Sequence, residues 1–329
     1  MSLKKPRASV TGIYGYIPEY VLTNAELEAI VNTSDEWIVS RTGIRERHIL
    51  KDKDKAAAFM GISAARGLLQ KVKVDPLDID LLICATITPD FSTPATANII
   101  SHAIGAYNAF GYDLQAACSG FLYALVTGAQ FIETNRCKKV IIVGTDKMSS
   151  VVNYKDRNTC VLFGDGAGAV LLEADYSGSG IVDSILKTDG SGEQQLLQKA
   201  GGSRNPASFD SVAAGDHFIY QNGRFVFKIA VSKMTEVIRE IMIKNNLSTD
   251  SVDFIVPHQA NARILSLVAQ ELGISMDKML MNIENLGNTT AATIPLCLWQ
   301  YQDKFKKNDR ILLTAFGGGF TWGAVYIIW

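Results

Sequence analysis

The order of apolar runs along this chain repeats once, at a spacing of about 170 residues. Residues 80–84 and 253–257 have the composition of buried strands and begin 173 positions apart. A second pair of predicted strands begins 171 positions apart, at residues 139–143 and 310–314. A third predicted strand, rich in small residues, occurs at 166–172 and again at 322–328. A helical spacing of apolar residues precedes the first strand of each set, at 56–71 and 228–245. This period is too long for a solenoid and predicts a duplicated α/β unit.

The alternation of strands and helices in both halves predicts a mostly parallel sheet covered by helical layers. We place the division near residue 175, which gives an N-terminal half of residues 1–175 and a C-terminal half of residues 176–329. A chance similarity between two α/β halves is the alternative explanation. Residues 189–222 interrupt this alternation of strands and helices, and they are rich in Gly, Ser, Gln and Asn. Loops of this length are often functional lids or disordered segments.

Charge and hydropathy exclude several classes of partner. The 329 residues carry 32 basic and 33 acidic side chains, a formal net charge of −1. Neither nucleic acid nor an anionic membrane surface is therefore expected as the main partner. The longest apolar runs have the length of strands, so no membrane insertion is predicted.

The cysteines are scattered, odd in number and free of CxxC spacing. This pattern argues against a disulfide framework and against a structural zinc site. It favours a reducing, cytoplasmic compartment. The five residues are Cys84, Cys118, Cys137, Cys160 and Cys297.

Cys118 stands among small residues at the predicted start of an apolar helix. Backbone N–H groups at a helix N-terminus are unpaired and carry a partial positive charge, which favours a thiolate. The small neighbours leave room for a substrate. A nucleophile is one interpretation, and a buried structural cysteine is the other.

The C-terminal half supplies two candidate partners for this cysteine. His258 directly follows the predicted strand 253–257, and active sites of α/β sheets gather at the carboxyl ends of strands. Asn288 lies 170 positions after Cys118, so in a duplicated fold we expect it to open the mirrored helix. Two such helix N-termini meeting at a pseudo-twofold axis would place both side chains in one cavity. A structural histidine and an ordinary helix N-cap are the alternatives.

Three consecutive glycines at 317–319 follow the predicted strand 310–314. They permit a close approach of the backbone and could direct an N–H group at a developing oxyanion. A phosphate-binding turn or a simple tight turn would use the same residues. The segment lacks the Lys and Ser/Thr that complete a P-loop.

Together these segments resemble the β-ketoacyl-acyl carrier protein synthase III family of the thiolase superfamily. One motif alone would be weak evidence, but their number, order and spacing over nearly the whole chain are specific. The matching segments are 33–38 (TSDEWI), 41–47 (RTGIRER), 114–125 around Cys118, 163–168 (FGDGAG), 257–261 (PHQAN), 287–289 (GNT) and 316–323 (FGGGFTWG).

The resemblance implies a thiolase-like five-layer αβαβα fold, α/β halves related by a pseudo-twofold axis, and a homodimer. It also implies a catalytic set of Cys118, His258 and Asn288. An acyl-CoA would acylate Cys118, and decarboxylative condensation with malonyl-acyl carrier protein would then start fatty acid synthesis. The N–H groups of Cys118 and Gly318 would form the oxyanion hole, while His258 Nε2 and the Asn288 amide would hold the second thioester. No cofactor and no metal are implied.

Other positions match the family's contacts with substrate and partner. Trp37 and Arg157 match a pair that sandwiches the adenine ring of CoA through stacking and cation–π attraction. A core tryptophan and a surface arginine are the alternatives. The further matches are Arg41 near the nucleotide phosphates, Phe227 and Asn261 in the pantetheine channel, Phe316 in the substrate site, and Lys228 and Arg263 for carrier-protein docking.

Two departures from the family pattern limit these expectations. Thr93 stands where many relatives carry a phenylalanine that closes the partner subunit's acyl pocket. We therefore expect this chain to accept longer or branched acyl groups. Gln270 and Glu271 stand where many relatives carry lysines, so attraction of an acidic carrier protein should be weaker than usual.

Four alternative functions stay open. A related condensing enzyme of specialised metabolism would use the same Cys-His-Asn set. A thiolase proper is disfavoured, because Asn288 replaces a second histidine. A non-catalytic partner subunit would be expected to lose Cys118, which is present. A cysteine hydrolase would lack malonyl-dependent carbon–carbon bond formation.

Overall fold

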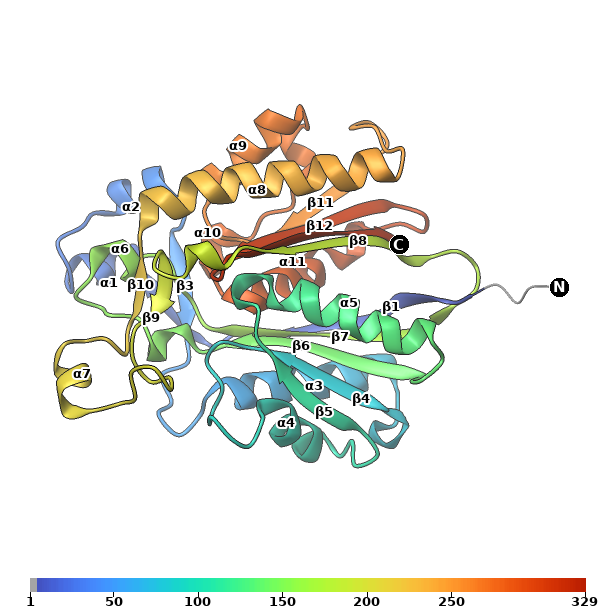
Figure 1. Ribbon diagram of the computed structural model, residues 1–329, viewed down its shortest axis with the longest axis horizontal. Coiled ribbons are helices and arrows are strands. Elements are labelled where there is room, and N and C mark those ends of the chain that lie inside the picture. The colour runs from blue at the N-terminus through green and yellow to red at the C-terminus, as the bar shows by residue number, and fades with distance from the viewer. Residues whose placement is uncertain (1–4) are drawn as a thin grey trace.

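The structure, a computed structural model, describes residues 5–329. Two sheets and three helical layers alternate in it, and the five layers are visible in Figure 1. The first sheet has the strand order β1-β7-β6-β4-β5, and the second has the order β11-β12-β13-β8. The strands are β1 Arg7–Tyr16, β4 Leu81–Ala85, β5 Phe110–Leu114, β6 Lys139–Asp146, β7 Gly166–Asp175, β8 Gly180–Thr188, β11 Phe254–Pro257, β12 Arg310–Gly317 and β13 Thr321–Ile328.

The helices form the remaining three layers. Helices α5 and α11 lie between the sheets, α3 and α4 cover the outer face of the first sheet, and α8 and α9 cover that of the second (Figure 1). Strand β4 is buried along its whole length, because helices cover both faces of its sheet. The bounds are α3 Ala57–Val72, α4 Thr96–Ile104, α5 Gly120–Glu133, α8 Gly223–Lys244, α9 Ala262–Leu272 and α11 Thr293–Tyr301.

Smaller elements gather at one end of the sandwich, where the cavity described below opens (Figure 1). They are α1 Asn24–Glu28, α2 Asp35–Thr42, α6 Arg157–Cys160, α7 Phe209–Ala213 and α10 Ile283–Leu286, with the strand pairs β2 Tyr20–Thr23 and β3 Glu46–Ile49, and β9 Leu196–Gln198 and β10 Ile219–Gln221.

The expected five-layer α/β architecture is confirmed, but the expectation of mostly parallel sheets is wrong. Strand β4 runs parallel to β5 and β6, and β11 runs parallel to β12, while the other pairs of both sheets are antiparallel. One cause is the short turn at residues 318–320 between β12 and β13. A turn of this length can join only antiparallel strands, whereas parallel strands need a long crossover.

The two sheets draw their strands from different parts of the chain. The first sheet uses residues 7–175 and the second uses residues 180–328. The match between halves is incomplete, because β5 has no counterpart strand. In its place Met279 forms only an isolated bridge with Ile255. Descent of the two halves from one duplicated unit stays a prediction.

The segment 189–222 is more ordered than its composition suggested. It contains α7 and the antiparallel pair β9 and β10. The amide of Ile219 donates to the Val151 carbonyl at 2.8 Å, which ties the segment to the first half. Its function as a lid stays a prediction.

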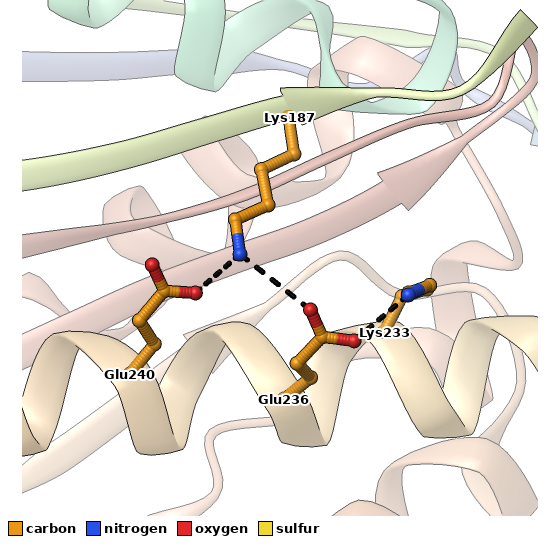
Figure 2. Close-up of polar contacts among 4 residues, drawn as sticks. All are labelled: Lys187, Lys233, Glu236 and Glu240. Carbon is orange, nitrogen blue, oxygen red and sulfur yellow. Dashed lines mark hydrogen bonds and ion pairs between the residues drawn. The ribbon is translucent and has the colours of Figure 1, made fainter.

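An ion-pair cluster joins α8 to the second sheet. Lys187 of β8 contacts Glu236 at 3.5 Å and also contacts Glu240, and Lys233 contacts Glu236 at 2.8 Å (Figure 2). The side chains are partly exposed to solvent. Within residues 5–329, no helix combines the length and apolar character needed to cross a membrane.

Candidate active site

A cavity of about 1180 Å³ contains the three residues that the sequence singled out for chemistry. Cys118, His258 and Asn288 all line it, and all three are buried. Cys118 comes from the N-terminal half, and the other two come from the C-terminal half. The structure therefore brings Cys118 together with two residues that lie 140 and 170 positions after it in the chain.

Cys118 lies where the sequence predicts, at the N-terminal end of an apolar helix. It belongs to a 3₁₀ turn, Ala117–Ser119, that leads directly into α5. The glycine turn after β12 approaches it closely. A side-chain carbon added at Gly317 would lie 2.7 Å from the Cys118 backbone nitrogen, so only glycine fits there. Gly318 lines the same cavity.

The expectation that the helix terminus makes Cys118 a thiolate is not met in this structure. Burial raises the pKa of the Cys118 thiol to about 12, and the Asp146 carboxylate adds to the rise. The backbone N–H of Cys118 opposes the rise without cancelling it. The thiol is therefore protonated at neutral pH, and its attack on a carbonyl requires that its proton leave.

The expectation that Asn288 mirrors Cys118 is also wrong. The counterpart of the Cys118 turn is the 3₁₀ turn Thr290–Ala292, which leads into α11 and begins 173 positions after Ala117. Ala291 therefore takes the place of Cys118. Asn288 lies just before this turn, where its Oδ1 accepts a hydrogen bond from the Thr290 amide at 2.9 Å. Because Oδ1 accepts this hydrogen bond, the NH₂ group is the part of Asn288 that can donate a hydrogen bond to a ligand.

His258 directly follows β11, as expected, and burial sets its charge. Desolvation lowers the pKa of His258 to about 3, so the imidazole is neutral at physiological pH. Its backbone N–H donates to the Thr314 carbonyl at 2.7 Å, and its Nδ1 lies 2.7 Å from the Thr293 hydroxyl. Nε2 is the ring nitrogen that is left for a ligand.

Asp146 is a buried residue behind the cavity lining that the sequence reasoning missed. It ends β6 in the first sheet and is fully buried beside the Thr290–Ala292 turn. One of its oxygens accepts hydrogen bonds from the Thr290 hydroxyl and the Ala291 amide. The other accepts from Thr86, Ile87 and Thr88. A carboxylate at the end of a buried strand was the available signal.

The residues expected to hold an adenine ring meet at the mouth of the cavity. The Arg157 guanidinium lies 4.5 Å from the centre of the Trp37 ring, and that of Arg41 lies 4.9 Å from it. All three line the cavity. The separation of Trp37 and Arg157 leaves no room for a third ring, since each stacking contact needs about 3.5–4 Å. Arg157 must move before an adenine can lie between them.

The other predicted contacts divide into two groups. Phe227, Asn261, Phe316 and Arg263 line the cavity, together with an arginine that was missed, Arg224 at the start of α8. Asn261 caps α9 and donates to the Arg41 carbonyl at 2.9 Å. Lys228 and Thr93 are exposed and do not line the cavity. One chain therefore does not bring Thr93 to the site.

The donor set at this site is suited to organic substrates. Residues 5–329 contain no group of three or more His, Cys, Asp or Glu side chains placed to hold a metal ion. The cavity presents one thiol, one neutral imidazole and several amide side chains, Asn288 among them, with arginines at its mouth. This set can form a covalent thioester, donate hydrogen bonds to an oxyanion and attract phosphates.

Comparison with known proteins places the chain among similar sequences and structures. Models for the N-terminal and C-terminal parts of 3-oxoacyl-[acyl-carrier-protein] synthase III match residues 112–190 and 242–329. The Bacteroides thetaiotaomicron protein named beta-ketoacyl-[acyl-carrier-protein] synthase III 2 is 52% identical over 327 residues, covering 99% of this chain and 98% of that protein.

Solved structures agree over nearly the full length. The 3-oxoacyl-[acyl-carrier-protein] synthase III of Aquifex aeolicus has a TM-score of 0.90 at 40% identity, covering 98% of this chain and 100% of that one. A priming beta-ketosynthase from a polyketide biosynthetic pathway has a TM-score of 0.91 at 31% identity, covering 100% and 98% of the two chains.

Proposed function

The chain belongs to the 3-oxoacyl-[acyl-carrier-protein] synthase III family, and from this premise we propose how its residues divide the reaction. The enzyme is an acyltransferase of the condensing type, a β-ketoacyl-acyl carrier protein synthase III. The observation that carries the proposal is the meeting of the buried residues Cys118, His258 and Asn288 in one cavity with arginines at its mouth.

In the first stage Cys118 takes an acyl group from acyl-CoA. The sulfur attacks the thioester carbonyl, a new carbon–sulfur bond forms, and the bond to CoA breaks. Because the Cys118 thiol begins protonated, its proton passes to the departing CoA sulfur, and free CoA leaves. The N–H groups of Cys118 and Gly318 stabilise the oxyanion that forms in between. Arg41, Arg157 and Trp37 hold the CoA nucleotide.

In the second stage a malonyl thioester on acyl carrier protein enters the acylated site. It loses CO₂, and the electron pair of the broken bond forms an enolate that attacks the acyl carbon on Cys118. Neutral His258 donates through Nε2 and Asn288 donates through its NH₂ group to the enolate oxygen. As the carbon–carbon bond forms, the bond between the acyl carbon and the Cys118 sulfur breaks, and the departing thiolate takes up a proton from solvent. The products are CO₂, β-ketoacyl-acyl carrier protein and the regenerated Cys118 thiol. The decarboxylation itself supplies the carbanion, so the proposal includes no cofactor.

The first experiment is intact-mass spectrometry after brief exposure to a panel of acyl-CoAs. We expect a mass gain equal to the acyl group, absent in Cys118→Ala. In Asn288→Ala, acylation of Cys118 should stay within about tenfold of the wild-type rate, whereas the rate of malonyl-dependent condensation should fall by about 10²–10³-fold. Asn288→Asp keeps the acceptor for Thr290 and removes the donor, so its condensation should be equally impaired.

Two outcomes of this experiment would contradict the proposal. No labelling by any acyl-CoA would reject CoA as the acyl source. Equal losses of acylation and condensation in Asn288→Ala would reject the division of work between Cys118 and Asn288.

A second copy of the chain completes the proposed site. Among residues 5–329, edge strand β5 pairs only with β4, and its first residue, Phe110, is 47% exposed. Phe91, in the loop that also carries Thr93, is 59% exposed. Exposed edge strands are templates for pairing with another chain. A homodimer formed through this edge would cover both aromatic residues and bring Thr93 to the partner's acyl pocket.

Carrier-protein docking and location complete the proposal. Arg263 at the cavity mouth and exposed Lys228 on α8 offer positive charge to an acidic carrier protein, and Gln270 and Glu271 weaken this electrostatic attraction.

All five cysteines are free and buried, which supports a cytoplasmic location.

A priming role in specialised metabolism is the second candidate, and the likeness to the polyketide priming ketosynthase favours it. The acyl panel separates the two candidates. Preferred labelling by short or branched primers that fatty acid synthesis uses supports the first candidate, and labelling by other acyl groups alone supports the second.

A further inference from the structure

The proposed second stage depends on which nitrogen of His258 carries the hydrogen. A neutral imidazole has a single N–H, and the partner of one nitrogen decides whether the other can donate. The partner of Nδ1 is the hydroxyl of Thr293, at 2.7 Å. His258 is 1% exposed and Thr293 is 2% exposed, so bulk water does not compete for this contact.

The Thr293 hydroxyl can hold either form of the ring. It lies 2.9 Å from the Thr290 carbonyl, one turn back in the chain, as well as 2.7 Å from Nδ1. If its hydrogen points to Thr290, Nδ1 must carry the imidazole hydrogen. If its hydrogen points to Nδ1, the imidazole hydrogen is on Nε2. The Thr290 carbonyl already accepts the backbone N–H of Thr293, so it keeps a partner in both cases.

We propose that Thr293 is a positioning residue whose hydroxyl donates to Nδ1 of His258 and so keeps the imidazole hydrogen on Nε2. This inference rests on the proposed function, in which Nε2–H donates to the enolate oxygen. Thr293 does not line the cavity, so its effect on the reaction passes through the histidine ring.

Asp146 fixes the turn that carries Thr293. The Thr290 hydroxyl and the Ala291 amide both donate to one oxygen of Asp146, and Thr293 opens α11 directly after this turn. Asp146 comes from β6 of the first sheet, whereas Thr293 and His258 come from the C-terminal half. The orientation of the imidazole therefore depends on contacts between both halves.

Nitrogen NMR of histidine-labelled protein tests the proposal directly at neutral pH. His258→Asn identifies the signals of His258. In the wild-type protein we expect a protonated Nε2 and an unprotonated Nδ1. A protonated Nδ1 would overturn the proposal, because Nε2 would then present a lone pair and could not donate to the enolate.

Three variants test the consequence for the reaction. Thr293→Val has nearly the same shape but no donor, and we expect it to raise the share of the Nδ1–H form and to lower condensation about tenfold, with a smaller loss of Cys118 acylation. Thr293→Ser should restore both the NMR signature and condensation. Thr235→Val is the matched control, since Thr235 is a buried threonine on α8 whose hydroxyl has no partner among residues 5–329.

The outcomes separate this inference from the proposed function. An unchanged NMR signature and condensation rate in Thr293→Val would overturn the role of Thr293 while leaving the condensation itself intact. A wild-type enzyme that shows the Nε2–H form but performs no malonyl-dependent condensation would reject the proposed function and leave the assignment of the hydrogen standing.

Discussion

At the scale of single residues, burial controls the protonation of the reactive groups. Desolvation raises the pKa of Cys118 to about 12 and lowers that of His258 to about 3, because each environment disfavours the charged form. Both groups are therefore neutral over the physiological range. A neutral imidazole can stabilise a developing enolate by hydrogen bonding, which suits the second stage better than the first.

The low pKa of His258 predicts a loss of stability in acid. The unfolded chain binds a proton on this histidine below about pH 6.5, whereas the folded chain does not until about pH 3. Stability should therefore fall as the pH drops from 6.5 towards 3. Between pH 7 and pH 5 the loss due to His258 should be about 2 kcal/mol.

Denaturant unfolding at both pH values measures this loss. His258→Asn should lose about 2 kcal/mol less than the wild-type protein over this range. His102→Asn replaces an exposed histidine and should follow the wild-type protein. Parallel pH profiles for His258→Asn and the wild-type protein would contradict the neutral, buried state of His258.

At the scale of elements, two polar connections differ in burial and therefore in how much each contributes to the free energy of unfolding. Asp146 joins the end of β6 to the turn before α11 inside the protein. Burial raises the pKa of this carboxyl, and the donated hydrogen bonds oppose the rise. The Lys187 cluster joins β8 to α8 at the surface (Figure 2). Solvent screens such exposed pairs, which contribute about 0–1 kcal/mol.

Replacing Asp146 by Asn should therefore cost far more than removing a surface charge. The amide NH₂ of the variant would face backbone or hydroxyl donors, and we expect the free energy of unfolding to fall by about 3 kcal/mol. Glu240→Gln in the surface cluster should change it by less than about 1 kcal/mol. Comparable losses in the two variants, measured by denaturant unfolding, would refute this ranking.

At the scale of the whole molecule, the candidate active site lies where residues of the two halves meet. Cys118 enters from one half and His258 and Asn288 from the other, so neither half alone contains the set. In the proposed dimer the site would also take a residue from a second chain, since exposed Thr93 would complete the acyl pocket of the other copy.

Thr93→Phe tests this assignment. If Thr93 limits the partner's acyl pocket, the larger side chain should shorten the acyl group that labels Cys118 most fully by intact-mass spectrometry. Ser177→Phe adds the same ring to an exposed turn outside the cavity lining and should leave the acyl profile unchanged. Light scattering should report a dimer for both variants. A monomeric wild-type protein, or an unchanged acyl profile in a dimeric Thr93→Phe, would argue against the role.

Features with a local cause were predictable from the sequence. The strands and helices of both halves lie close to their expected ranges, because hydrophobic spacing directly reflects which side of an element is buried. The positions of Cys118 before α5 and of His258 after β11 were predictable for the same reason. The clustering of both with Asn288 was expected from the family resemblance, whereas the mirrored-helix argument for Asn288 was wrong.

Only the tertiary structure decided the remaining features. Strand direction, the order within residues 189–222 and the counterpart of Cys118 depend on how distant segments pair. The sequence alone determined the repeated elements and the candidates for chemistry, through local spacing and composition. The structure decided their protonation, the contact of His258 with Thr293 and the hold of Asp146 on the neighbouring turn, because desolvation and hydrogen bonding arise from residues that meet only after folding.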